Sequence, residues 1–129
     1  MADKKENKKT ILVVEDDKFL IKIYQVKFEK EGFEVMIASD GNEAMAMLYG
    51  NKIPDIVLLD LMLPITNGFD VLAAMKKKEK WKNIPVIVLS NLGQDSDIKK
   101  AKDLGVAEYV VKSNSKINEI VSKVKQYLE

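Results

Sequence analysis

The 129-residue sequence has no cysteine, no histidine and no arginine, and each absence excludes a class of chemistry. Without cysteine, the chain can form no disulfide, no thiolate nucleophile and no cysteine-based metal site. Without histidine, it has no imidazole base or ligand and cannot carry a phosphohistidine. All 21 basic residues are lysine, so the side chain best suited to bidentate contacts with phosphate and guanine is missing.

Long hydrophobic runs and a large net charge are missing too. The longest apolar runs have the length of a strand, and the polar start "MADKKENKK" lacks the hydrophobic stretch of a signal peptide. A net charge of +1 gives no general attraction to nucleic acid or to a membrane. We therefore expect a cytoplasmic protein with a disordered Lys-rich tail at residues 1–9 and one domain at residues 10–129.

The sequence instead contains a regular alternation of apolar runs and amphipathic segments. The apolar runs predict strands at residues 10–15, 33–39, 55–60, 85–90 and 108–112, and helices are predicted at residues 16–32, 40–51, 67–81, 94–105 and 113–128. Strict alternation predicts an α/β fold in which helices cover both faces of a parallel sheet. The runs "IVLL" and "VIVL" are continuously apolar, as expected for central strands.

Each of the five predicted strands ends in polar or charged residues. In a parallel sheet these positions meet at one edge, which is where such folds bind ligands. The second strand ends in Ser39, which we expect to cap the next helix. The residues at the other four strand ends are Glu15, Asp16 and Asp17, then Asp60, then Ser90 and Asn91, and finally Lys112.

Several acids at one sheet edge repel one another, so a positive charge is needed between them. Carboxylates about 4 Å apart repel by about 4 kcal/mol at an effective dielectric of about 20, and one lysine does not offset three acids. A hard divalent cation, Mg²⁺ or Mn²⁺, suits such an oxygen-rich site. The alternative is that the acids are caps of helices or loops, and for Asp17 alone this is the better interpretation.

A metal at this edge gives Asp60 a chemical role. Aspartate carboxylates form aspartyl-phosphates, so Asp60 is a candidate nucleophile for phosphoryl transfer. A metal held by Glu15 and Asp16 would neutralise phosphoryl oxygens, and Lys112 and Ser90 would contact others.

Several stretches of the sequence resemble the receiver domains of bacterial two-component response regulators. They are "ILVVEDD", "DIVLLDLMLPITNGFDVL", "IPVIVLSN", "GVAEYVVKS" and the final amphipathic helix, and together they cover the chain after the tail. The resemblance implies a flavodoxin-like, doubly wound sheet of five parallel strands in the order 2-1-3-4-5 with five helices.

The resemblance also implies a role for each matching residue. Asp60 would be the phosphoacceptor and Tyr109 the aromatic switch residue. The implied metal ligands are Glu15, Asp16, Asp60 and the backbone carbonyl of Met62, and the implied catalytic residues are Asp60, Ser90 and Lys112.

Four residues that depart from the family pattern bear on function. Ser113 follows Lys112 where receivers usually have a proline after a cis bond, which leaves the form of this bond open. Met62 and Leu92, which flank the phosphate in the family, are both apolar, and Asn91 is larger than the usual residue. We therefore predict that the phosphorylated form hydrolyses slowly.

The partners follow from the resemblance and from the missing histidine. The phosphoryl donor must be external: a histidine kinase, a histidine phosphotransfer protein or a small molecule such as acetyl phosphate. We expect no DNA-binding or enzymatic output module, and a protein target that is contacted through residues 94–128. Ile21 and Val26 of the first helix are candidates for a donor-docking patch, although a broad core face is the better interpretation.

Two other functions also fit an α/β sheet. An aspartyl-nucleophile phosphohydrolase would need a second acid at position 62, where this chain has Met62. A flavin-binding electron carrier would need a Ser-, Thr- or Gly-rich phosphate loop after the first strand, where this chain has three acids. We therefore expect a phosphorylation-dependent signalling switch that catalyses only its own phosphorylation and dephosphorylation.

Overall fold

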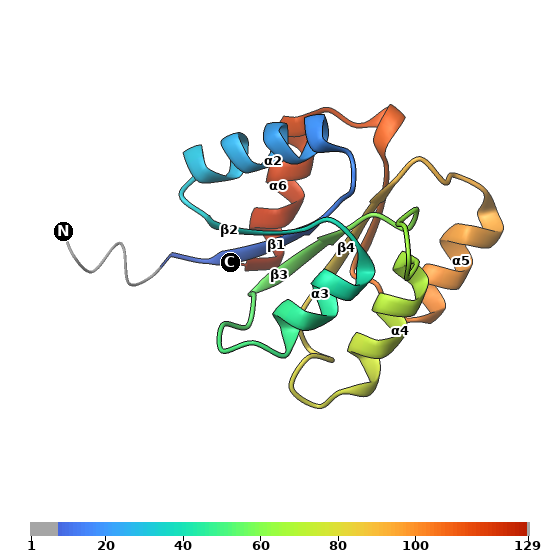
Figure 1. The fold of residues 1–129 in the computed structure, drawn as a ribbon. Helices are drawn as coiled ribbons and strands as arrows, with labels where there is room; N and C mark the ends of the chain where they lie inside the picture. The colour runs from blue at the N-terminus through green and yellow to red at the C-terminus, as the bar shows by residue number, and fades with distance from the viewer. Residues whose placement is uncertain (1–7, 129) are drawn as a thin grey trace.

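A computed structural model describes residues 8–128 as a parallel sheet between two layers of helices (Figure 1). Lys8 and Lys9, which belong to the predicted tail, are exposed, and residues 1–7 of that tail lie outside the described residues. No helix in the described part is long and apolar enough to cross a membrane.

The sheet has the predicted order of strands. Its members are β1 (Thr10–Val14), β2 (Glu34–Ala38), β3 (Ile56–Leu59), β4 (Val86–Ser90) and β5 (Glu108–Val111). They pair in parallel in the order β2-β1-β3-β4-β5, which confirms the prediction. In the register, Val14 lies opposite Leu59 and Leu59 opposite Val88, so β1, β3 and β4 end side by side.

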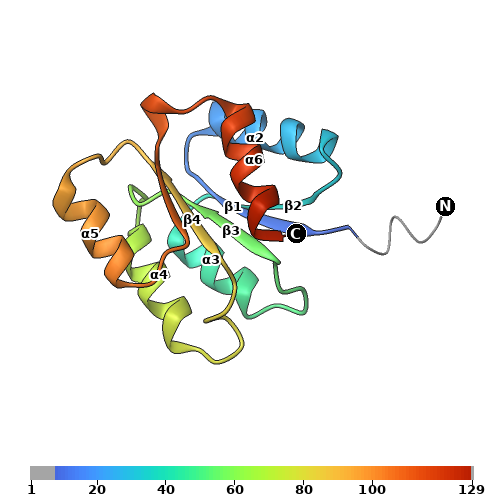
Figure 2. The same ribbon diagram turned by 180° about the vertical axis from the view of Figure 1, so that it is seen from behind.

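The helices divide between the two faces of the sheet (Figures 1 and 2). On one face lie α2 (Lys18–Lys30) and α6 (Ile117–Leu128). On the other lie α3 (Gly41–Leu48), α4 (Gly68–Lys77) and α5 (Asp95–Asp103). The last helix begins later than predicted, because a short 3-10 turn, η1 (Lys112–Asn114), and an extended Ser115 precede it.

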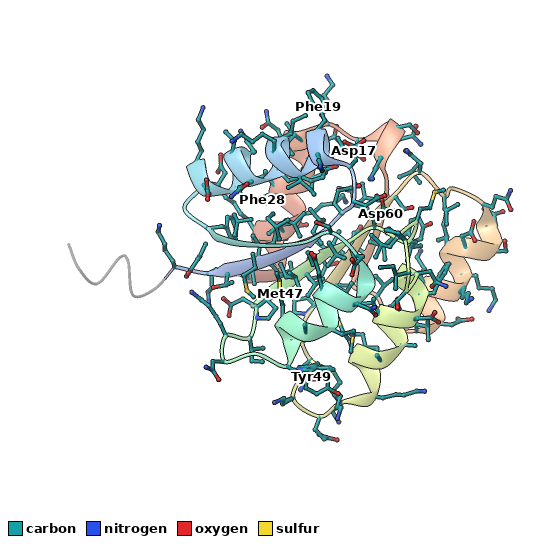
Figure 3. All side chains as sticks on the ribbon, viewed as in Figure 1. Asp17, Phe19, Phe28, Met47, Tyr49 and Asp60 are labelled. Atoms are coloured by element: carbon teal, nitrogen blue, oxygen red, sulfur yellow. The ribbon has the colours of Figure 1, made fainter. Side chains whose placement is uncertain are left out.

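Alternate strand residues build two separate cores. Successive side chains of a strand point to opposite faces, so Val57 and Leu59 pack under α3, α4 and α5, while Leu58 packs under α2 and α6. Phe28 of α2 is fully buried in the second core, whereas Phe19 at the start of the same helix points outward (Figure 3).

Trp81 is a buried residue within the lysine-rich run at residues 76–82. That run reads as a solvated helix end, but Trp81 is fully buried and its ring meets Tyr49 edge-on at 4.7 Å between centroids. The lysines around it stay at the surface, and Lys78 lies over the Tyr49 ring. A single aromatic residue within a charged run can therefore anchor the run to the core.

The helix caps agree with the sequence in one case and not in the other. Asp17 caps α2 as predicted, since its carboxylate accepts hydrogen bonds from the N–H groups of Phe19 and Leu20. The prediction for Ser39 was wrong, because α3 begins one residue later and Asp40 accepts the bond from Glu43 N–H.

The peptide bond after Lys112, which the sequence leaves open, is trans, because no cis bond occurs within residues 8–128.

Candidate functional site

Two buried acids stand where β1 and β3 end. Glu15 N–H donates to the carbonyl of Ala38, and Asp60 N–H donates to the carbonyl of Val14, each at 3.0 Å. These bonds continue the sheet one residue past each strand, so both side chains are held at its carboxyl edge. Glu15 is 2% exposed and Asp60 5%, whereas the neighbouring Asp16 is exposed.

The three carboxylates meet as the sequence predicts. One oxygen from each of Glu15, Asp16 and Asp60 can be chosen so that all three lie within 4.8 Å of one another. An all-carboxylate donor set with one solvent-facing member suits a hard divalent cation that keeps some of its water. The residues present therefore fit the metal site that the sequence predicts.

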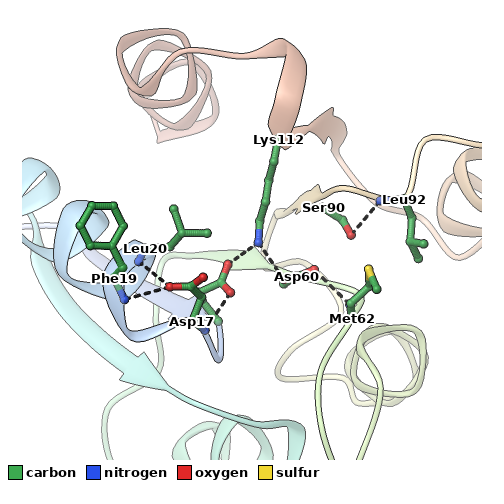
Figure 4. A network of polar contacts seen from close by, with 9 residues as sticks. Asp17, Phe19, Leu20, Asp60, Met62, Ser90, Leu92 and Lys112 are labelled. Atoms are coloured by element: carbon green, nitrogen blue, oxygen red, sulfur yellow. Dashed lines mark hydrogen bonds and ion pairs between the residues drawn. The ribbon is translucent and has the colours of Figure 1, made fainter.

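Lys112 follows the edge strand β5 and reaches this cluster at the same carboxyl edge of the sheet. Its ammonium donates to Glu15 Oε1 at 2.6 Å and to Asp60 Oδ2 at 2.8 Å (Figure 4). Burial lowers the pKa of Lys112, but the hydrogen bonds and charges of the two carboxylates outweigh it, so this pKa is raised. Burial raises the pKa of Glu15, and its bonds to Lys112 and to the backbone only partly oppose this.

Backbone groups fix the orientation of both carboxylates. Met62 N–H donates to Asp60 Oδ1 at 3.0 Å, and Asp17 N–H donates to Glu15 Oε2 at 3.1 Å. The loop after Asp60 brings Gly68 back against the backbone of Asp60. A Cβ on Gly68 would lie only 2.4 Å from the Asp60 carbonyl oxygen. Glycine is therefore required where α4 begins.

The backbone of Leu92 links Ser90 to Tyr109 through two hydrogen bonds. Ser90 is fully buried, and its Oγ accepts a hydrogen bond from Leu92 N–H at 3.3 Å. The Tyr109 hydroxyl donates to the carbonyl of the same Leu92 at 2.5 Å. The sequence identifies Ser90 and Tyr109 but not this connection, because backbone groups of an apolar residue leave no signal in residue type.

The loop that follows Asp60 exposes apolar side chains. Met62 is 56% exposed and Ile65 75%. Ile65 has a φ of 69° and is the only non-glycine residue between 8 and 128 with a positive φ. Thr66 N–H donates to the Pro64 carbonyl across it at 2.8 Å, which makes a tight three-residue turn.

The sequence model of the response regulator receiver domain matches residues 11–125. The chain belongs to the response regulator receiver family. Receivers are phosphorylation switches of two-component signalling, and apart from autophosphatase activity they are not enzymes. The acidic cluster of this receiver is consistent with the divalent metal that the family uses.

Solved structures agree with this assignment. The receiver is 36% identical to the phosphorylated cyanobacterial phytochrome response regulator RcpA, over 93% of each chain, with a TM-score of 0.83. It is 33% identical to the Mn²⁺-bound response regulator Rcp1, over 92% of this chain and 90% of that one, with a TM-score of 0.79. A response regulator from Chloroflexus aurantiacus is 27% identical over 95% of this chain and 98% of that one, with a TM-score of 0.87.

Proposed function

We propose that this receiver accepts a phosphoryl group on Asp60. The observation that carries the proposal is the position of Lys112, whose ammonium bonds both Asp60 and Glu15 beside a third carboxylate. A partly buried cation that touches the acceptor carboxylate and one other acid has the place needed to contact an incoming phosphoryl oxygen. The similarity to phosphorylated RcpA supports the same role.

The chain's own groups prepare Asp60 for the transfer. Met62 N–H and Lys112 each hold one oxygen of the carboxylate, so its plane is fixed before the donor arrives. An Asp60 oxygen then bonds to phosphorus, and the bond from phosphorus to the donor breaks with its electron pair going to the leaving group. Lys112 can follow the negative charge onto the phosphoryl oxygens.

Ser90 supplies a further donor for the phosphoryl group. Its oxygen already accepts from Leu92 N–H, which leaves the hydroxyl proton free to be donated. If Ser90 turns toward the phosphoryl group, its bond to Leu92 changes, and so does the position of the carbonyl that holds Tyr109. We propose that Tyr109 carries the signal in this way to the surface formed by residues 94–128, where a protein target binds.

The metal site is proposed for Mg²⁺, with Mn²⁺ as a substitute. Glu15, Asp16, Asp60 and the Met62 carbonyl would hold the ion, and when bound it supplies positive charge that neutralises phosphoryl oxygens. The Mn²⁺-bound form of the similar Rcp1 supports this assignment.

The phosphoryl donor is proposed to be a histidine kinase or a histidine phosphotransfer protein that docks on α2. A hollow of about 390 Å³ beside this helix is lined by three apolar residues and three lysines, namely Ile23, Val26, Ile117, Lys22, Lys27 and Lys30. Val26 is exposed as predicted, but Ile21 is half-buried. Such a surface favours a donor with apolar and acidic residues.

Incubation with Mg²⁺ and acetyl phosphate, followed by intact mass, tests the proposal. We expect one phosphoryl adduct on the wild type, none on Asp60→Asn, and the wild-type adduct on the control variant Asp97→Asn. An adduct that persists in Asp60→Asn would contradict the assignment. Steady hydrolysis of a phosphate ester would indicate a phosphohydrolase instead, although Met62 stands where that mechanism needs an acid.

The lifetime of the adduct tests the role of the apolar flank. Replacing Met62 by Asn puts a hydrogen-bonding group beside the phosphoryl group, where it can orient water. We expect phosphate loss about two- to tenfold faster, the range that one net hydrogen bond supports. An unchanged or slower loss in Met62→Asn would refute the predicted slow hydrolysis.

A further inference from the structure

We propose that Met62 is a peroxide-sensitive modification site, and that its oxidation to the sulfoxide shortens the life of the phosphorylated state. The inference rests on the proposed phosphorylation of Asp60. It assigns to this side chain a chemical input that is separate from the phosphoryl donor.

Exposure singles out Met62 among the methionines that the structure describes. Its side chain is largely in solvent, with 56% of the residue exposed, whereas Met75 is fully buried. The other three are partly buried and pack against the core; they are Met36, Met45 and Met47. Because the chain has no cysteine, methionine sulfur is its most readily oxidised group, and exposure then decides which one reacts first.

The Met62 side chain lies where its polarity affects how water approaches a phosphoryl group on Asp60. Its N–H is bonded to Asp60 Oδ1, so its side chain starts beside the acceptor carboxylate. Figure 4 shows the thioether on the side of Asp60 that faces Ser90 and Leu92. Leu92 is the second apolar residue at this place and is half-buried. The unoxidised side chain therefore forms part of an apolar flank that gives water no hydrogen-bonding partner.

The oxidation is a balanced two-electron step. Hydrogen peroxide transfers one oxygen atom to the sulfur, its O–O bond breaks, and water leaves. The thioether is oxidised and the peroxide is reduced. The product keeps the length of methionine but carries a strongly polar oxygen, and methionine sulfoxide reductases reverse the change.

The new oxygen changes how water meets the phosphoryl group. A sulfoxide oxygen accepts a hydrogen bond and can hold a water molecule beside the aspartyl phosphate. In hydrolysis the water oxygen bonds to phosphorus, the bond from phosphorus to Asp60 breaks, and the water's proton passes to solvent. The products are the free carboxylate and inorganic phosphate, so oxidation returns the switch to its resting state sooner.

The first measurement does not depend on phosphorylation. The folded protein is treated with graded hydrogen peroxide, and each methionine is followed by peptide mapping. We expect sulfoxide at Met62 before Met36, Met45, Met47 and Met75. Equal or slower oxidation of Met62 would overturn the inference while leaving the proposed function intact.

The second measurement compares phosphoryl lifetimes before and after oxidation. Each protein is phosphorylated with Mg²⁺ and acetyl phosphate, freed of donor and followed by intact mass. We expect oxidation to speed phosphate loss about two- to tenfold in wild type, on the scale of one net hydrogen bond. The matched variants are Met62→Leu, which should show a ratio near one, and Met47→Leu, which should respond like wild type.

The possible failures are distinguishable. A phosphorylated protein whose lifetime does not respond to Met62 oxidation, or an equal response in Met62→Leu, overturns the inference alone. Absence of any phosphoryl adduct overturns the proposed function, and the inference falls with it.

Discussion

At the scale of single residues, Glu15 shows where the site opposes stability. Its carboxylate is almost fully buried, and burial raises its pKa above the ordinary value of 4.5. The folded protein therefore binds this proton more tightly than the unfolded chain does. The contribution of this group to stability declines as pH rises from about 4.5 through the raised pKa.

Glu15→Gln, measured in the absence of metal, tests whether burial of the Glu15 charge lowers stability as pH rises. The amide removes the buried charge but can still accept the hydrogen bond from Lys112, whose raised pKa keeps it protonated throughout this range. We expect the variant to gain free energy of unfolding relative to wild type as pH rises above 4.5, measured by urea denaturation in EDTA. A difference that does not change with pH would contradict the stated effect of burial. Mg²⁺ binding, measured by calorimetry, should weaken.

Ile65 is a second residue that lowers stability near the site. A β-branched side chain at a φ of 69° strains the backbone. Because Ile65 is 75% exposed, burial of its side chain offsets little of this strain energy. We expect Ile65→Asn to raise the free energy of unfolding by about 1 kcal/mol, measured by urea denaturation, because Asn tolerates this backbone better. Ile53→Asn is the control, since Ile53 is also exposed but has no positive φ. An equal gain in both variants would show that strain is not the cause.

At the scale of elements, the sequence predicts which segments are strands and helices better than it predicts where they end. Apolar runs indicate β1, β3 and β4 because these strands are buried along their whole length, and they indicate the flanking strands β2 and β5 because most of their residues are half-buried. Helix ends depend on backbone partners, so the sequence predicted Ser39 as the cap of α3, whereas in the structure the carboxylate of Asp40 accepts the hydrogen bond from Glu43 N–H. The start of α6 was missed for the same reason, since its preceding turn has no distinctive residues.

The cap of α2 can be tested directly. Asp17 accepts two backbone N–H groups at the first turn, and Asp17→Ala leaves both without this partner. We expect a loss of about 1 kcal/mol in the free energy of unfolding. Glu29→Ala, in the exposed last turn of the same helix, should change it by less than about 0.5 kcal/mol. Chemical denaturation measures the free energy of unfolding of both variants. Equal losses in the two variants would argue against a capping role for Asp17.

At the scale of the whole molecule, alternation of strands and helices predicts a parallel sheet but not its strand order. The order came from the family resemblance, and the structure confirms it. The side chains of the acidic cluster and Lys112 could be predicted because they follow strands that end at one edge. The backbone partners could not, since Met62 N–H and the Leu92 carbonyl belong to apolar residues.

The fold brings Lys112 to Asp60 and to Glu15, which lie 52 and 97 positions earlier in the chain, and it brings Asp60 to Glu15 and Asp16. Metal binding at this cluster should therefore be linked to folding. An ion that binds only the folded form stabilises it by about 2.7 kcal/mol at a concentration of about 100 times its dissociation constant. We expect Mg²⁺ to raise the thermal midpoint of the wild type, and much less that of Asp60→Asn. Equal shifts in the two proteins, measured by calorimetry, would place the ion elsewhere.

The central claim is that Asp60 carries the phosphoryl group. The most direct measurement is to phosphorylate the protein with Mg²⁺ and acetyl phosphate, reduce the acyl phosphate with borohydride, and map the peptides by mass spectrometry. Borohydride converts a phosphorylated aspartate to homoserine and leaves free carboxylates unchanged. The account predicts homoserine at position 60. Homoserine at another aspartate, or none in a protein that carries the adduct, would contradict it.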